Sequence, residues 1–69
     1  MRPDRVVFQE DHVDVIDFKT GIDPSDKERK KHEGQVRQYM TAIAQRDARK
    51  VRGFVYYCSS GECAEVAPV

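Results

Sequence analysis

Two short apolar runs near the start of the chain, separated by four polar residues, constrain the fold most strongly. Arg5-Val6-Val7-Phe8 precedes the polar segment 9–12, and Val13-Asp14-Val15-Ile16 follows it. We expect strands over about residues 4–9 and 13–19, joined by this turn into a hairpin. The second run has apolar side chains on both faces, which is typical of a strand that lies inside a sheet and is covered on both sides.

This hairpin would gather three charged side chains at one end. Asp4 begins the first strand, and Asp17 and Lys19 end the second. Side chains two residues apart in a strand leave the same face, so Lys19 lies beside Asp17. Carboxylates are ligands for hard divalent cations, and a bound cation with an ammonium beside it suits hydrolysis of a phosphate ester. The residues therefore predict a divalent-metal site with a cation beside it. The alternative is an ordinary salt bridge between Asp17 and Lys19 at the end of a strand.

A single helix is expected in the middle of the chain. The segment Ser25-Asp26-Lys27-Glu28 has the pattern of a capping box. Gly34 costs about 1 kcal/mol in a helix interior, so we expect regular helix from about His32 to about Asp47. One apolar stripe has helical spacing; its members are Val36, Tyr39, Met40 and Ile43.

Two more strands complete the expected fold. Val51–Cys58 and Glu62–Val66 read as strands, with Ser59-Ser60-Gly61 as the turn between them. The order is then β-β-α-β-β. We expect an α+β domain in which a small mixed sheet packs on one main helix.

The charges are unevenly distributed, although the net charge is zero. Residues 1–26 carry seven acidic and three basic side chains, whereas residues 27–52 carry nine basic and three acidic ones. An acidic region that attracts a cation beside a basic region that attracts a polyanion suits a metal-dependent enzyme acting on nucleic acid. The alternative is an ordinary solvated helix face rich in lysine and arginine.

Size and composition exclude several other classes. A chain of 69 residues forms at most one domain with a thin core. No apolar stretch approaches the roughly 20 residues of a membrane span, and no apolar leader follows Met1. Cys58 and Cys63 match no zinc pattern, so we expect free thiols in a cytoplasmic protein, although a tight turn could bring the pair face to face.

Three motifs occur in a fixed order: Pro3-Asp4, Asp17-Phe18-Lys19, and the Q-x-x-x-Y pattern from Gln35 to Tyr39. Together they resemble the RecB-like branch of the PD-(D/E)XK nuclease superfamily. The neighbouring residues are similar to the C-terminal nuclease domain of UvrD/RecB/AddA-type helicase–nucleases. The resemblance implies a restriction-endonuclease-like fold and Mg²⁺-dependent hydrolysis of DNA, with Mn²⁺ as a substitute. It also implies exonuclease action in double-strand-break repair, with the helicase portion of the parent polypeptide or complex as a partner.

The resemblance also implies roles for individual residues. Asp4 and Asp17 would hold the metal with the backbone carbonyl of Phe18, and Lys19 would orient the attacking water or stabilise charge in the transition state. Gln35 and Tyr39 would support the active site and the DNA backbone, although Tyr39 also belongs to the apolar stripe and could equally be core. His32 lies close to the site. Basic residues are candidates for phosphate contact as a group: Arg2, Arg5, Lys27, Arg29, Lys30, Lys31 and Arg37.

Relatives of this branch begin with a helix and another strand ahead of the position of Asp4. The sequence begins almost on that motif, so we expect it to be the C-terminal part of a nuclease domain, with little activity alone. Apolar surface left open on the sheet would favour self-association. Two alternatives remain: a catalytically silent DNA-binding or scaffold fragment, and an unrelated small α/β domain in which the Asp-x-Lys motif arises by chance.

Overall fold

Four strands and one helix follow one another in the predicted order in a computed structural model of the chain, which describes residues 4–21 and 24–68. The elements are β1 (Arg5–Phe8), β2 (His12–Lys19), α1 (Asp26–Ala44), β3 (Lys50–Tyr57) and β4 (Glu62–Val66). The expected α+β class and the β-β-α-β-β order are confirmed.

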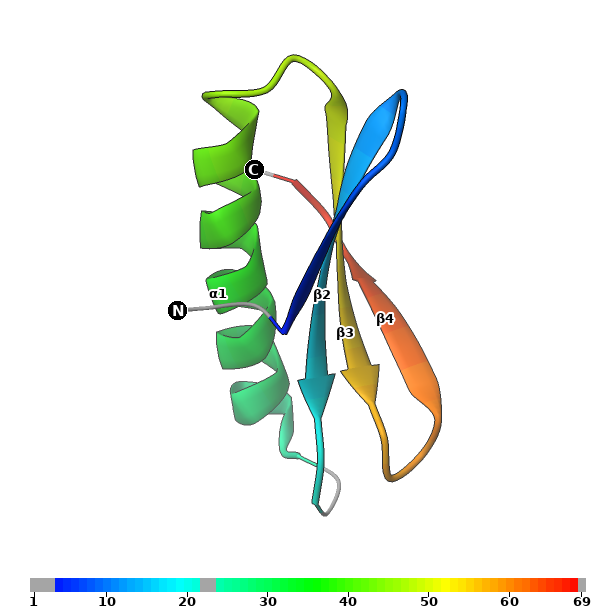
Figure 1. The fold of residues 1–69 in the computed structure, drawn as a ribbon. Coiled ribbons are helices and arrows are strands. Elements are labelled where there is room, and N and C mark those ends of the chain that lie inside the picture. Colours follow the sequence, from blue (N-terminus) through cyan, green and yellow to red (C-terminus); the bar gives the residue numbers. More distant parts are fainter. Residues whose placement is uncertain (1–3, 22–23, 69) are drawn as a thin grey trace.

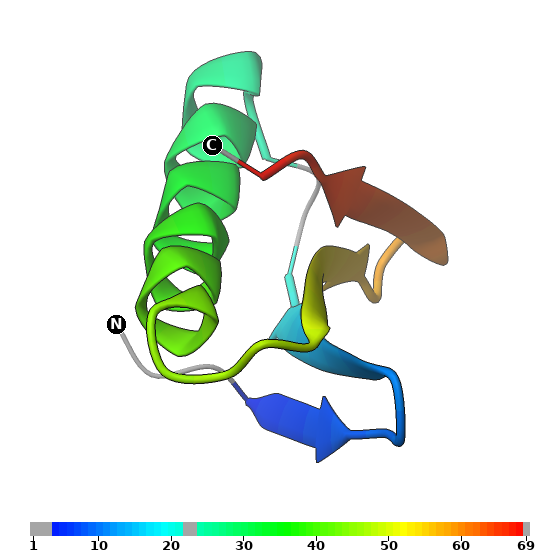
Figure 2. The ribbon, with the colours of Figure 1, turned by 90° about the horizontal axis from the view of Figure 1, so that it is seen from above.

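The strands form one mixed sheet in the order β1-β2-β3-β4. β1 and β2 are an antiparallel hairpin, β2 and β3 run parallel, and β3 and β4 are antiparallel. A parallel pair needs a long crossover, and α1 supplies it by running back along one face of the sheet (Figure 1). Viewed from above, the helix is one layer and the sheet is a second layer beside it (Figure 2).

The core lies between these two layers. Val36 and Met40 of α1 pack on side chains from the helix-facing side of the three strands β2, β3 and β4, namely Val15, Val55, Tyr57 and Val66. β2 is interior to the sheet as predicted, but the expectation that both its faces are covered is wrong for the described residues. Phe18, on the other face, is 43% exposed. Its ring contacts that of Tyr56 edge to face, at a centroid distance of 5.8 Å.

The helix begins earlier than predicted. The Ser25 hydroxyl accepts a hydrogen bond from the backbone N–H of Glu28, and the Glu28 carboxylate accepts one from the backbone N–H of Ser25. This reciprocal capping box stabilises the first turn. The negative charges of Asp26 and Glu28 also interact favourably with the positive end of the helix dipole. These contributions outweigh the cost of Gly34, which the prediction weighted too heavily. The helix ends at Ala44, not near Asp47, and the backbone N–H of Asp47 donates to the carbonyl of Ile43 in the closing turn.

Within residues 4–21 and 24–68, no helix is both long and apolar enough to cross a membrane.

Candidate active site

The hairpin register sets Asp4 opposite Asp17. Arg5 pairs with Ile16 in the antiparallel ladder, so the residue before β1 faces the residue after Ile16. The Oδ2 atom of Asp4 accepts a hydrogen bond of 2.7 Å from the backbone N–H of Phe18. This bond ties the start of β1 to the end of β2, and it holds the two carboxyl groups at one corner of the sheet.

Burial makes Asp17 the unusual member of the pair. It is only 4% exposed and lies on the helix-facing side of β2 with Val13 and Val15. Burial raises the pKa of the Asp17 carboxyl; the Lys19 ammonium, whose Nζ lies 3.0 Å from Oδ2, opposes this shift, and the neighbouring Asp4 carboxyl adds to it. Asp17 is therefore harder to ionise than an exposed aspartate, even with the lysine beside it.

Asp4 has the opposite tendency. The hydrogen bond from the Phe18 N–H lowers the pKa of the exposed Asp4 carboxyl, and a hydrogen bond with Asp17 lowers it further. A proton shared between the two groups therefore resides on Asp17. Two carboxyl groups that share a proton in this way are arranged to exchange it for a cation.

The donor set fits a hard divalent cation. Within the described ranges, no group of three or more His, Cys, Asp or Glu side chains is close enough to hold a metal ion. The protein ligands would therefore be the carboxylates of Asp4 and Asp17, with the Phe18 carbonyl as a third oxygen. The N–H of Phe18 points toward Asp4, and the N–H and C=O of one strand residue leave the same side. Mg²⁺ commonly binds through one or two carboxylates and keeps several waters.

Gln35 and Tyr39 lie on one flank of α1. Arg37 marks the opposite flank, because its Nε donates a 2.9 Å hydrogen bond to the carbonyl of Ala67, which follows β4. At 100° per residue, Gln35 and Tyr39 fall on the side of the helix toward β1 and Asp4. Gln35 is half-buried, and Tyr39 packs against the core cluster. Tyr39 thus has the core contact that the apolar stripe indicated.

The basic candidates are dispersed, and they do not converge on the corner. Arg5, Lys27, Lys30 and Lys31 are exposed. Arg29 forms an ion pair with Glu62 at 2.7 Å and lies 4.4 Å above the ring of Tyr57. Arg37 is held by Ala67 on the far flank. Arg2 and Pro3 lie outside the described residues.

Tyr57 is a neighbour of the site that the sequence analysis did not identify. The parallel register pairs Tyr57 with Lys19, so β3 ends beside the lysine of the Asp-x-Lys motif. Burial raises the pKa of the Tyr57 phenol. The sequence held a usable signal for it, since two strands joined by one helix are expected to be parallel neighbours whose carboxyl ends meet at one edge.

His32 lies against the same part of the sheet. Its ring centroid is 6.2 Å from that of Tyr57. Burial lowers the pKa of the His32 imidazole, and the charge of Lys19 lowers it further. The imidazole is therefore held in its neutral form beside the lysine.

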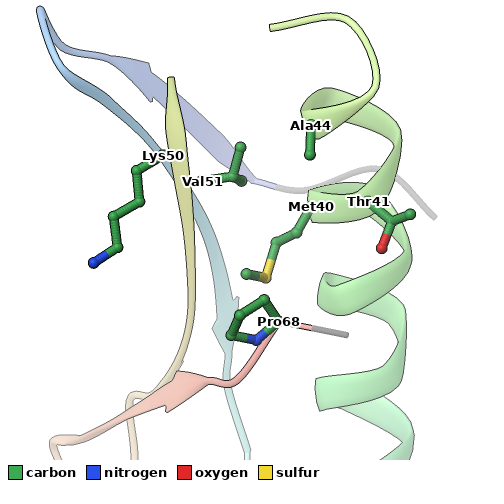
Figure 3. A pocket seen from close by; sticks show the side chains of 6 residues that line it. All are labelled: Met40, Thr41, Ala44, Lys50, Val51 and Pro68. Atoms are coloured by element: carbon green, nitrogen blue, oxygen red, sulfur yellow. The ribbon is translucent and has the colours of Figure 1, made fainter. Parts of the chain in front are cut away.

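A mostly apolar cavity lies elsewhere in the molecule. A space of about 440 Å³ opens between the C-terminal half of α1, the start of β3 and the segment after β4. Met40 and Val51 point into it, whereas the Lys50 side chain extends to the other side of the strand (Figure 3). No carboxylate lines it; its lining residues are Met40, Thr41, Ala44, Lys50, Val51 and Pro68. None of Asp4, Asp17 and Lys19 is among its lining residues.

The comparisons with known proteins identify the family of the chain. The family model for the PD-(D/E)XK nuclease superfamily matches residues 2–67, which is nearly the whole chain and includes all three motifs. No curated protein and no solved structure gives a match with the chain. The two acidic residues and the lysine of the hairpin stand within the matched region, and the chain belongs to the PD-(D/E)XK nuclease superfamily.

Proposed function

We propose that this protein hydrolyses phosphodiester bonds of DNA with Mg²⁺, as the nuclease portion of an ATP-dependent helicase–nuclease in double-strand-break repair. Membership of the superfamily carries nuclease activity as the coarse expectation. The observation that carries the proposal is the corner of the hairpin, where the carboxyls of Asp4 and Asp17 meet and Lys19 lies 3.0 Å from Asp17.

Each residue has a distinct part in this proposal. Asp4 and Asp17 would hold the cation together with the Phe18 carbonyl. Bound there, Mg²⁺ would supply Lewis acidity toward the phosphate and make water a better nucleophile at neutral pH. Lys19 carries its charge where negative charge develops on the phosphate oxygens, so it stabilises the transition state more than the ground state. Asp17 holds the ammonium in place through the ion pair.

Burial strengthens the role of Lys19. Its side chain is 31% exposed, and its partner Asp17 is almost entirely shielded from water. Charges in such surroundings interact more strongly than charges in bulk water. A cation held by the two carboxylates would weaken the attraction of Asp17 for the Lys19 ammonium, which would then be available to the phosphate.

DNA would approach along the N-terminal half of α1. Lys27, Lys30 and Lys31 are exposed there, and Arg5 is exposed beside Asp4. Each contact of this kind with a phosphate contributes affinity that falls with salt and carries no sequence information. Exonuclease action and a helicase partner follow from the motif resemblance and remain parts of the proposal.

One observation favours a second candidate, a catalytically silent DNA-binding or scaffold module. The described residues supply only two carboxylates to the metal and no third acidic or histidine ligand. Such a site binds Mg²⁺ weakly and positions water poorly. DNA binding through the basic residues would persist without catalysis.

Degradation of end-labelled linear DNA separates the two candidates. We expect slow cleavage that requires Mg²⁺ or Mn²⁺, ceases on addition of a chelator, and is lost in both Asp17→Ala and Lys19→Ala. Asp14→Ala, on the same strand but facing away from the helix, is the matched control and should retain the activity. Cleavage that survives Asp17→Ala would contradict the proposal, and DNA binding without any cleavage would support the silent module.

A further inference from the structure

A second, smaller pocket adjoins the corner on the side of β3. It has a volume of about 160 Å³ and lies between the end of β2, the start of α1 and the end of β3. A water molecule accounts for about 30 Å³ in the liquid, so the pocket admits a group several times larger. Its lining is mostly polar: Lys19, Thr20, Pro24, Glu28, His32, Tyr57 and Ser59.

Two of the lining side chains carry buried polar atoms that are not hydrogen-bonded. Among the described residues, neither the Tyr57 hydroxyl nor Nδ1 of His32 has a hydrogen-bond partner. Tyr57 is 1% exposed, so its hydroxyl cannot turn to bulk water. A buried hydroxyl without a partner costs stability and is rare in folded proteins. This pocket holds two such unpaired polar atoms, the Tyr57 hydroxyl and the His32 ring nitrogen, next to the proposed catalytic lysine.

The chemistry of the pocket favours an anion with several acceptor oxygens. The Lys19 ammonium and the Tyr57 hydroxyl are donors, and the imidazole of His32 can donate through a ring nitrogen in the appropriate tautomer. Glu28 is the one acidic member, and its Oε1 already accepts hydrogen bonds from the N–H and the hydroxyl of Ser25, each at 3.2 Å. Its charge is thus committed to the helix cap. The positive end of the helix dipole adds to the attraction.

We propose that this pocket binds a phosphate group of the DNA strand, next to the phosphate that is cleaved, with the Tyr57 hydroxyl and His32 as its donors. This inference rests on the proposed function for the identity of the ligand. Lys19 lines the pocket and also pairs with Asp17, so the pocket lies directly beside the proposed metal site. One side of the lysine faces the carboxylate corner, where the scissile phosphate lies, and the other lines the pocket. The pocket then fixes the register of the strand across the metal site.

Tyr57→Phe is the decisive variant, because it removes only the hydroxyl and leaves the ring in the core. Removal of an unpaired buried hydroxyl should not lower stability, and thermal unfolding checks this. Tyr56→Phe is the matched control: it makes the same change one residue earlier, on the opposite face of β3. His32→Gln tests the imidazole while keeping a polar side chain.

The measurement is a titration of the full chain with inorganic phosphate, followed by ¹H–¹⁵N NMR without divalent metal. We expect saturable shifts centred on residues 19–20, 32 and 57–59. The affinity should fall by about tenfold in Tyr57→Phe, fall in His32→Gln, and stay unchanged in Tyr56→Phe. A second arm uses a single-stranded oligodeoxynucleotide without terminal phosphates in the presence of Ca²⁺, and the same order of affinities is expected.

Equal affinity of wild type and Tyr57→Phe for phosphate and for the oligonucleotide would overturn the inference, as would shifts centred outside the pocket. The outcome is separable from that of the nuclease assay. If the wild type cleaved DNA with a metal and Tyr57→Phe bound phosphate normally, the inferred phosphate pocket would be wrong and the proposed function would stand. If the chain did not cleave DNA but bound phosphate in a way that depends on Tyr57, the phosphate pocket would stand and the proposed nuclease function would fall.

Discussion

As the proposed metal ligand, Asp17 would have to meet two conflicting requirements, because a ligand carboxylate must be ionised and this side chain is almost fully buried. Burial raises the pKa of its carboxyl despite the Lys19 ammonium. Relative to the unfolded chain, the folded state therefore binds the proton of Asp17 more tightly. The stability associated with it is fully present below the unfolded-state value of 3.8 and is lost as the pH rises through the higher folded-state pKa. Ionisation of Asp17 therefore costs stability in the folded state, and such costs are common at functional sites.

Asp17→Asn should accordingly stabilise the fold at pH 7 while it abolishes cleavage and metal binding. An amide of the same shape has no ionisation cost, so thermal unfolding at pH 7 should occur at a higher temperature than in the wild type. Asp14→Asn on the same strand is the control, and its unfolding temperature should change in the opposite direction. Hydrogen bonds from Arg52 lower the pKa of Asp14, so this variant should be less stable. A lower unfolding temperature for Asp17→Asn than for Asp14→Asn would contradict the argument.

At the scale of the elements, the contact between α1 and β3 depends on the absence of a side chain at Gly53. A Cβ atom built there would lie 2.3 Å from Sδ of Met40 and 2.7 Å from Cγ1 of Val36. Gly53→Ala should therefore push the helix from the sheet and destabilise the fold by about 1–3 kcal/mol, the usual range for overpacking.

Gly34→Ala is the matched comparison for this prediction. A Cβ at Gly34 meets nothing within 4 Å, and alanine is favoured over glycine in a helix interior by roughly 0.5–1 kcal/mol. Urea denaturation of both variants should show opposite signs. If Gly53→Ala were as stable as the wild type, the close packing of α1 on β3 would be wrong.

The connection between α1 and β3 is held by an ion pair with a predictable pH range. Hydrogen bonds from the Arg49 side chain and backbone lower the pKa of Asp47 from 3.8 to about 2. Arg49 also donates to the carbonyl of Gln9, 2.9 Å away, which ties this connection to the β1–β2 turn. Because the folded pKa is depressed, the stabilisation is present above pH 3.8 and is lost as the pH falls toward about 2. In Asp47→Asn, unfolding temperatures measured between pH 5 and pH 2 should lose part of the wild-type pH dependence; an unchanged pH profile would contradict this role.

Local sequence patterns predicted the strands and the helix better than they predicted the contacts between elements that are distant in the sequence. The hairpin, the capping box and the last strand are encoded within a few neighbouring residues, and they were found at or close to the expected positions. The start of α1 was predicted too late. The sequence shows the cost of Gly34, but it does not show how far the capping box and the packing of the helix offset that cost. Asp4, Asp17 and Lys19 could be found because a hairpin joins them. Tyr57 could not be found from local spacing alone, because it reaches Lys19 only through the parallel pairing of β2 and β3.

At the scale of the whole molecule, the sheet has one covered face and one open face. Within residues 4–21 and 24–68, α1 packs on one side only, and Ile16, Phe18, Phe54 and Tyr56 lie on the other. A two-layer domain of this size has little stability in reserve. Open apolar surface of this kind favours association.

We therefore predict concentration-dependent self-association of the chain through the open face. Sedimentation velocity should show dimer at high concentration, and Phe18→Lys should shift the equilibrium to monomer. Phe8→Lys is the control: Phe8 is 60% exposed, but it pairs with Val13 and so belongs to the other side of the sheet. A chain that stays monomeric at every concentration, or a Phe8 variant that dissociates as readily as the Phe18 variant, would contradict this prediction.

The central claim is that Asp4 and Asp17 form one divalent-metal site, and paramagnetic broadening by Mn²⁺ tests it most directly. The measurement needs no catalytic activity, so it is decisive even if the chain alone cleaves DNA slowly. On titration with Mn²⁺, we predict selective loss of NMR signals from residues 4 and 17–19 and from the start of α1. Mg²⁺ should reverse the effect by competition, and Asp17→Asn should abolish it. Broadening centred elsewhere, or unchanged in Asp17→Asn, would contradict the account.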